Sequence, residues 1–267
     1  MQKRYFYLIR IQFLGYRLHG WQHQPRLKTV ERMLRRTLKY VLEERRFKML
    51  GASRTDAMVS AYGAAFELFL YDEPLEDPDA FLHEFNLNLP PDIRALDIRQ
   101  VDESFNVIND AVMKEYVYLF AHGQKSHPFC APFLMTFNEV LDIEKMKRAA
   151  KIFEGKHNFK HYCTRPNEQT IVEREIRKCE ITENDLITAS FFPQETYALH
   201  VHGEGFLRNQ IRKMMGALVL VGKGELSLDF LAKSLEQETD VAPPNFVAPG
   251  SGLILKDIAF ALQEVTS

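Results

Sequence analysis

Residues 4–13 read Arg-Tyr-Phe-Tyr-Leu-Ile-Arg-Ile-Gln-Phe, a run of aromatic and β-branched residues that partly alternates. Such a run is typical of a β-strand. Thr29 then stands where a helix cap is expected, because apolar residues recur at helical spacing from Val30 to Leu42 behind it. A second strand is predicted near 47–50. The opening of the chain therefore predicts a strand, a helix and a strand in succession.

The same order of elements recurs further along the chain. Apolar and alternating segments predict strands at 64–71, 93–101, 115–121, 171–181 and 197–203, and helical spacing predicts helices at 79–88, 145–153, 205–222 and 228–235. Strands thus flank helices once in each half. This pattern predicts an α+β fold with two similar α/β-sandwich halves (ferredoxin-like), which share a mixed, mainly antiparallel sheet flanked by helices. We place the halves at 1–105 and 106–267.

The composition is that of a soluble globular protein with a sizeable core, since 46% of the 267 residues are hydrophobic and 26% are charged. No apolar run approaches the roughly 18 residues of a membrane helix, and the N-terminus does not resemble a signal peptide. Cys130, Cys163 and Cys179 show no C-x-x-C spacing, which argues against a disulfide framework and a zinc site. We expect three buried thiols, a cytoplasmic protein, no membrane association and no metal.

Charge is segregated along the chain. Residues 1–60 hold 14 Lys and Arg against 4 Asp and Glu, a difference of +10, whereas residues 61–110 hold 2 against 12, a difference of −10. A basic segment of this kind suits the phosphates of a nucleic acid. The solvated face of a single helix explains the charge pattern equally well, so charge alone leaves both interpretations open.

Few motifs in the chain carry chemistry by themselves. No Gly-rich phosphate loop and no G-x-S-x-G elbow is present, and the closest His pairs, His19/His23 and His200/His202, lack an obvious third metal ligand. In Ser53-Arg54-Thr55-Asp56-Ala57, Arg54 stands close enough to hold the carboxylate of Asp56 ionised, and an ionised carboxylate is a nucleophile suited to a sugar carbon. On this spacing alone, an Asp that caps a turn or pairs with its neighbour is the commoner case.

A second cluster lies in the run from Phe206 to Gly216. On a helix, Arg208 and Arg212 are four residues apart and emerge on one side, where they suit a phosphodiester or a carboxylate. A solvated basic stripe is again the commoner alternative.

Taken together, these segments resemble the TruA family of tRNA pseudouridine synthases, in order and along most of the chain. The segments that carry the resemblance are Gly20-Trp21-Gln22-His23-Gln24 (G-W-Q-x-Q), Thr29-Val30-Glu31 (T-V-E), Ser53–Ala57 (G-R-T-D-A), Leu89-Pro90-Pro91-Asp92-Ile93 (L-P-x-D-I), Lys114-Glu115-Tyr116-Val117-Tyr118 (K-x-Y-x-Y), Gly155-Lys156-His157-Asn158-Phe159 (G-x-H-D-F), Phe206–Gly216 (F-L-x-H-M-V-R-x-M-V-G) and Ala248–Leu253 (A-P-x-x-G-L).

The resemblance implies an enzyme that converts uridine to pseudouridine at positions 38 to 40 of the tRNA anticodon arm, without cofactor or metal. It makes Asp56 the catalytic residue, which acts on the sugar carbon, on the base or on a sugar proton. Arg212 would be its ion-pair partner, Tyr116 would stack on the base, and Arg54 would enter the space left by the flipped uridine. Gln22, Gln24, Arg208 and Lys213 would contact RNA.

On this resemblance, the half at 1–105 binds RNA and carries the catalytic Asp, and the half at 106–267 completes the active-site cleft. The family also implies a homodimer that binds tRNA.

The sequence departs from the family pattern at two single positions downstream of Asp56, in one three-residue segment and at one position before Arg212. Met58 replaces a Gly and Ser60 a frequent His, Asn106-Val107-Ile108 replaces H-A-R, and Asn209 stands where many members have His. Asp56, Tyr116 and Arg212 are kept, so we expect catalysis, while the choice of uridine stays open. The alternative is a divergent member that is catalytically weak or inactive and acts as a tRNA-binding protein, or one with a different target uridine. An unrelated α+β protein with chance matches is a third interpretation.

Overall fold

The computed structural model describes residues 3–237 and 240–261, and its chain divides into two compact units. Residues 1–112 and 255–267 form the first unit, and residues 113–254 form the second. The chain therefore returns to the first unit at its end, which the pattern of elements did not indicate.

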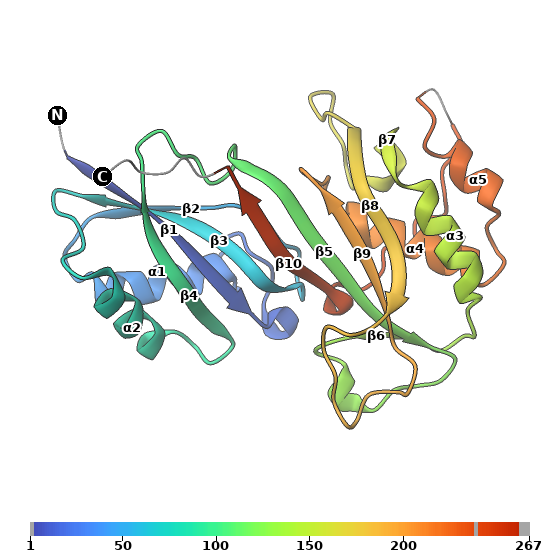
Figure 1. The fold of residues 1–267 in the computed structure, drawn as a ribbon, viewed down its shortest axis with the longest axis horizontal. Coiled ribbons are helices and arrows are strands. Elements are labelled where there is room, and N and C mark those ends of the chain that lie inside the picture. Colours follow the sequence, from blue (N-terminus) through green and yellow to red (C-terminus); the bar gives the residue numbers. More distant parts are fainter. Residues whose placement is uncertain (1–2, 238–239, 262–267) are drawn as a thin grey trace. The chain divides into compact units, whose positions relative to one another are not determined.

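The first unit is an antiparallel sheet with two helices packed on it (Figure 1). Its strands are β1 (Arg4–Phe13), β2 (Phe47–Gly51), β3 (Ser60–Tyr71), β4 (Ile93–Val101) and β10 (Leu253–Phe260), and its helices are α1 (Val30–Val41) and α2 (Pro78–Asn88). Strand β1 lies between β3 and β4, and β3 also pairs with β2 and β10. A short 3-10 turn, Gly15–Arg17, follows β1. The alternation seen at 4–13 thus belongs to a central strand.

Helix α1 begins where the sequence predicts. Thr29 has an extended backbone, and its hydroxyl accepts the N–H of Arg32 at 3.4 Å, so it is an N-cap. Leu34 and Leu38 of this helix are fully buried, and the ring of Phe85 in α2 packs edge-on against Phe66 of β3. These contacts make the core of the first unit.

The second unit contains the remaining strands of the ten-stranded sheet, with helices on their flank (Figure 1). Its strands are β5 (Ala111–His122), β6 (Met135–Phe137), β7 (Gly155–Asn158), β8 (Glu173–Glu183) and β9 (Tyr197–Gly203), and its helices are α3 (Ile143–Ile152), α4 (Gln210–Gly222) and α5 (Leu228–Lys233). Strands β5, β9, β8 and β7 pair antiparallel in that order, and β6 pairs parallel with β5. Short 3-10 turns lie at Pro128–Cys130, Lys160–Tyr162 and Gly250–Gly252.

Helix α4 is the centre of the packing in this unit. It is buried from Met214 to Gly222, and α3 contacts it as well as β8 and α5. Apolar residues therefore lie on all sides of α4, which is typical of a helix enclosed by its neighbours.

The predicted fold class, an α+β fold with a mixed, mainly antiparallel sheet flanked by helices, is confirmed. The three cysteines are buried, as predicted. None of the helices in the described part of the chain is long and apolar enough to cross a membrane.

Several elements differ from the prediction. The helix expected at 205–222 begins at Gln210, because Asn209 has a left-handed backbone (φ 61°) that cannot continue a helix. Strand β3 begins at Ser60, four residues before the predicted start. Strands β6, β7 and β10 were not predicted.

Candidate functional site

Asp56 lies in the loop between β2 and β3, and backbone hydrogen bonds hold this loop on both sides of it. The N–H of Trp21 donates to the carbonyl of Thr55 at 3.0 Å, and the N–H of Met58 donates to the carbonyl of Leu18 at 3.0 Å. The side chain of Asp56 is half-buried. The loop is therefore anchored by the backbone of residues 18–21, which lie more than thirty positions earlier.

Close approach of the two loops requires a glycine. Gly20 has a φ of 84°, and a Cβ added there would lie 2.7 Å from the carbonyl oxygen of Thr55. The buried Trp21 ring covers Gly51 at the end of β2, where a Cβ would lie 2.4 Å from the indole. Both glycines are thus places where only hydrogen fits.

The N-terminus of α1 completes this arrangement. The N–H groups of Val30 and Glu31, which no helical carbonyl can satisfy, donate to the carbonyls of Gly20 and Trp21 at 3.1 and 3.0 Å. Three of the quoted motifs (Gly20–Gln24, Thr29–Glu31 and Ser53–Ala57) therefore meet in the first unit and support Asp56 together.

Glu31 also fixes the loop that carries the two predicted RNA-binding glutamines. Its carboxylate accepts the N–H of His23 at 2.9 Å and pairs with Arg35 at 2.9 Å. Burial acts to raise the pKa of Glu31, but these bonds outweigh it, so the pKa is lowered. Gln22 and Gln24 are exposed on this loop. Glu31 belongs to the motif Thr29–Glu31, but the sequence did not indicate a role for its side chain.

A buried carboxylate anchors the base of the same loop. Asp92, of the segment Leu89–Ile93, accepts the ammonium group of Lys28 at 3.0 Å and lies 3.5 Å from the guanidinium of Arg17. The exposed fraction of its side chain is 6%, so the carboxylate is shielded from water, whereas the side chain of Lys28 is 38% exposed. Asp92 is a further residue whose role the sequence did not indicate.

The positions downstream of Asp56 keep the loop intact despite their departure from the family pattern. Met58 has a φ of 67°, the left-handed conformation that glycine adopts at no steric cost. Ser60 is buried, and its hydroxyl accepts the N–H of Gly15 at 2.9 Å. Arg54, on the other side of Asp56, is exposed.

The segment Asn106–Ile108 is a compact turn held by two carboxyl groups. The N–H of Val107 donates to Glu67 at 3.1 Å, and the N–H of Asn106 donates to Asp110 at 2.7 Å. Glu67 is fully buried in β3, and burial, with a smaller contribution from Asp110, raises its pKa. Ile108 is 45% exposed at the tip of this turn, where the family pattern has an arginine.

In the second unit, Tyr116 and Tyr118 lie on β5. Tyr116 is 8% exposed, and its ring meets that of Phe206 edge-on at 5.2 Å. Tyr118 is fully buried, its hydroxyl donates to the carbonyl of Pro249 at 2.8 Å, and burial raises its pKa. Tyr116 therefore has a fixed ring, while Tyr118 supports the segment Ala248–Leu253.

Arg212 lies in the first turn of α4 and is oriented by two acceptors. Its Nε donates to the carbonyl of Ala248 at 2.7 Å, and its guanidinium donates to the side-chain oxygen of Asn209 at 2.9 Å. Asn209 in turn donates to the hydroxyl of Thr164 at 3.0 Å. Asn209 adopts its left-handed backbone more readily than most residues and positions Arg212; the sequence noted it only as a departure.

The structure distributes the predicted site residues between the two units. The first unit contains Gln22, Gln24, Arg54 and Asp56. The loop that carries the two glutamines is hydrogen-bonded to the loop that carries Arg54 and Asp56. Tyr116, Arg208, Arg212 and Lys213 belong to the second unit, where Arg208 is exposed and Lys213 bonds to the turn after β7. Within the described residues, no group of three or more His, Cys, Asp and Glu side chains could hold a metal ion.

Comparison with known proteins identifies relatives along nearly the whole chain. A family model described as tRNA pseudouridine synthase matches residues 149–261. The tRNA pseudouridine synthase A of Methylacidiphilum infernorum is 33% identical over 244 residues, which cover 89% of this chain and 91% of that protein. That of Syntrophomonas wolfei is 31% identical over 94% of this chain and 95% of its own length. A tRNA pseudouridine synthase A 2 of Bacillus cereus is 30% identical over 95% of this chain and 99% of its own length.

Proposed function

The chain belongs to the tRNA pseudouridine synthase A family, and we propose that it isomerises uridines at positions 38 to 40 of the tRNA anticodon arm with Asp56 as the catalytic carboxylate. The enzyme class, a tRNA pseudouridine synthase, rests on these relatives. The assignment of Asp56 rests on one observation above the others. The N–H of Trp21 bonds to the backbone of its loop, and the start of α1 bonds in turn to the carbonyls of Gly20 and Trp21.

The reaction breaks the bond between C1′ of the ribose and N1 of uracil and forms a bond between C1′ and C5 of the rotated base. The proton on C5 is lost and N1 gains one, so the atoms balance and no redox partner is needed. An ionised carboxylate can serve as the nucleophile or as the base for this chemistry. The rigid loop would hold that carboxylate in place through the rotation of the base.

The other residues have roles on the substrate in this proposal. Arg212, held by Ala248 and Asn209, is by resemblance the ion-pair partner of the carboxylate. Tyr116, with its ring fixed against Phe206, stacks on the flipped uracil. Arg54 is exposed and can enter the space that the uridine leaves.

The decisive experiment maps pseudouridine chemically on tRNA that lacks it at positions 38 to 40. The protein is expected to form pseudouridine there, Asp56→Asn is expected to form none, and the exposed control Asp185→Asn is expected to match the parent protein. Asparagine keeps the shape of the side chain and removes its charge, so the loop should persist. Full activity of Asp56→Asn would refute the assignment of this residue even if the product forms.

A second candidate function is tRNA binding without turnover. The exposed Ile108, at a position where the family has an arginine, favours it, because a contact to RNA through this residue cannot be ionic. The same assay separates the two functions, since a binding protein would retain tRNA and restore pseudouridine at no position. Modification at another uridine would instead indicate a different target.

The resemblance also carries proposals on assembly and location. We place the protein in the cytoplasm as a homodimer that binds tRNA. Light scattering after size-exclusion chromatography measures the mass directly, and a mass near the 31.1 kDa of one chain would refute the dimer.

A further inference from the structure

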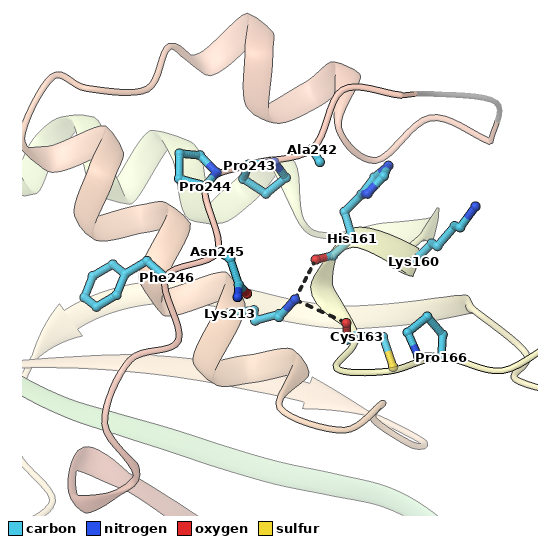
Figure 2. A pocket seen from close by; sticks show the side chains of 10 residues that line it. All are labelled: Lys160, His161, Cys163, Pro166, Lys213, Ala242, Pro243, Pro244, Asn245 and Phe246. Carbon is cyan, nitrogen blue, oxygen red and sulfur yellow. Dashed lines mark hydrogen bonds between the residues drawn. The ribbon is translucent and has the colours of Figure 1, made fainter.

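A pocket of about 400 Å³ opens in the second unit, on the side of α4 that carries Lys213 (Figure 2). The turn after β7 contributes Lys160, His161 and Cys163 to its wall, and residues 242–246 contribute the remainder together with Pro166. Its size falls within the usual range for pockets that hold small ligands, about 300–1,000 Å³. The pocket can therefore accept a group as large as one nucleotide.

The pocket is positively charged. Its lining includes Lys160, His161 and Lys213 and contains no Asp or Glu. Within the part of the chain that the structure describes, neither lysine forms an ion pair with a carboxylate. An anion in the pocket would thus give these two lysines a counter-charge.

Lys213 is prepared to bind such an anion. Its ammonium group donates to the carbonyls of His161 and Cys163, both at 3.2 Å, and these two bonds leave a third hydrogen. Burial lowers the pKa of Lys213, because a partly desolvated ammonium group is costly without a counter-charge. A phosphate oxygen at the third hydrogen would supply that charge in a charge-assisted hydrogen bond.

The opposite wall offers flat, weakly polar surfaces. Figure 2 shows Lys213 extending from α4 toward the turn of His161, with the segment from Pro243 to Asn245 on the other side of its ammonium group. Proline rings and an imidazole can pack on the faces of a sugar or a base, and the Asn245 amide can bond to a base edge. These surfaces suit a nucleoside better than an inorganic anion.

The pocket is separate from the surroundings of Arg212. Successive residues of an α-helix point about 100° apart, and Arg212 bonds to Ala248 and Asn209 whereas Lys213 bonds to the turn after β7. Arg212 does not line the pocket. A nucleotide in it is therefore a different one from the nucleotide that Arg212 is proposed to serve.

We propose that this pocket binds one phosphodiester of the RNA substrate together with its nucleoside, at a nucleotide other than the reacting one. Lys213 and Lys160 bind the phosphate, and His161, Pro243 and Asn245 contact the nucleoside. The proposal rests on the proposed function only in taking RNA as the ligand.

The first test measures the salt dependence of tRNA affinity. Each phosphate contact contributes about 0.9 to the slope of log K against log salt concentration on duplex nucleic acid and about 0.7 on single strands. Lys213→Met is expected to reduce the slope by about one contact. Lys160→Ala, at an exposed position where loss of folding is not a concern, is expected to weaken binding in the same direction. Lys125→Ala removes the same charge from an exposed loop outside the pocket and should leave the affinity and slope unchanged.

The second test locates the nucleotide. Neutral methylphosphonate linkages are introduced one at a time into the tRNA anticodon arm, and each RNA is bound to the parent protein and to Lys160→Ala. At one position the methylphosphonate should weaken binding by the parent protein but hardly weaken binding by Lys160→Ala. The neutral linkage and the lysine substitution remove the same contact, so their effects should not add. Additive losses at every position, or unchanged slopes in both pocket variants, would overturn the proposal. Protection of the pocket lysines from acetylation by inorganic phosphate but not by RNA would also overturn it and assign the pocket to a small anion.

The two proposals fail separately. Asp56→Asn should abolish the product and keep the salt slope of the parent protein, whereas the pocket variants should lose tRNA affinity and show a reduced slope. A protein that forms no pseudouridine but passes the methylphosphonate test would refute the proposed catalysis alone.

Discussion

Replacement of Met58 by glycine should stabilise the protein, because Met58 occupies a backbone conformation that only glycine adopts without cost. Its φ is 67°, two residues after Asp56. A left-handed conformation costs an L-residue about 1–2 kcal/mol. Glycine also loses more chain entropy on folding, which offsets about 0.5–1 kcal/mol of that gain. The side chain of Met58 is only half-buried, so its removal sacrifices little packing.

The expected net effect of Met58→Gly is a gain of about 0.5–1 kcal/mol in the free energy of unfolding. For a chain of this size such a gain raises Tm by about 1–4 °C. Urea titration followed by circular dichroism measures the midpoint, and calorimetry measures Tm. The hydrogen bond from the N–H of residue 58 to Leu18 is retained in the variant, so pseudouridine formation should persist.

Two controls isolate the backbone as the cause. Met58→Ala removes the same side chain and keeps the strained conformation, so it should bring no gain. Met58→Asn should fall between alanine and glycine, because asparagine tolerates the left-handed region better than most residues. Equal stability of the alanine and glycine variants would refute the reasoning, since the strain would then not reside in the backbone.

Three further predictions concern residues that the structure identifies around the two halves of the site. Gly20→Ala should destabilise the Asp56 loop by about 1–2 kcal/mol from backbone strain alone, with the contact to Thr55 adding to this, and should reduce product formation; an unchanged urea midpoint would contradict it. Asn209→Ala should lower kcat more than it raises KM, because Arg212 loses an orienting acceptor; a change in KM alone would show that Asn209 acts in binding instead. Glu67→Gln should remove a pH dependence of stability. The pKa of Glu67 is raised in the folded protein from its ordinary value of 4.5, so the folded state holds the proton more tightly and stability falls as pH rises from about 4.5 through the raised value. Parallel curves of unfolding free energy against pH for the parent protein and Glu67→Gln would contradict this.

Local patterns predicted the elements whose signals lie within the element itself. The strand at 4–13, the Thr29 cap and the helix behind it were correct, because alternation, capping chemistry and helical spacing are properties of a single segment. Strand β10 was not predicted because its signal does not lie within its own segment. It is paired with β3, almost two hundred positions earlier, and that partner determines which of its residues are buried.

Gly63 is required by the pairing of β10 with β3, but a single sequence does not show why this position is a glycine. A Cβ at this position would lie 2.8 Å from the carboxylate of Asp257, which pairs with Arg10. The glycine thus marks the close approach of β10 to β3. A glycine within a strand indicates close backbone approach in general but does not name the partner.

The sequence names candidate site residues, whereas it does not indicate the residues that support them. The types and order of Asp56, Tyr116 and Arg212 could be compared with a family. Glu31 fixes the loop of the two glutamines by accepting the N–H of His23, and Asn209 orients the guanidinium of Arg212. Such hydrogen bonds leave no distinctive spacing in the sequence.

The manner in which the Asp56 loop is held favours catalysis over passive tRNA binding. Its principal bonds join N–H and carbonyl groups of residues 18–21 and 55–58, and backbone groups are the same whatever side chain is present. Met58 can therefore replace a glycine at a cost in strain without removing the bond to Leu18. Ser60 contributes a bond of its own, because its hydroxyl accepts the N–H of Gly15. The two substitutions therefore leave the backbone hydrogen bonds that hold the Asp56 loop in place.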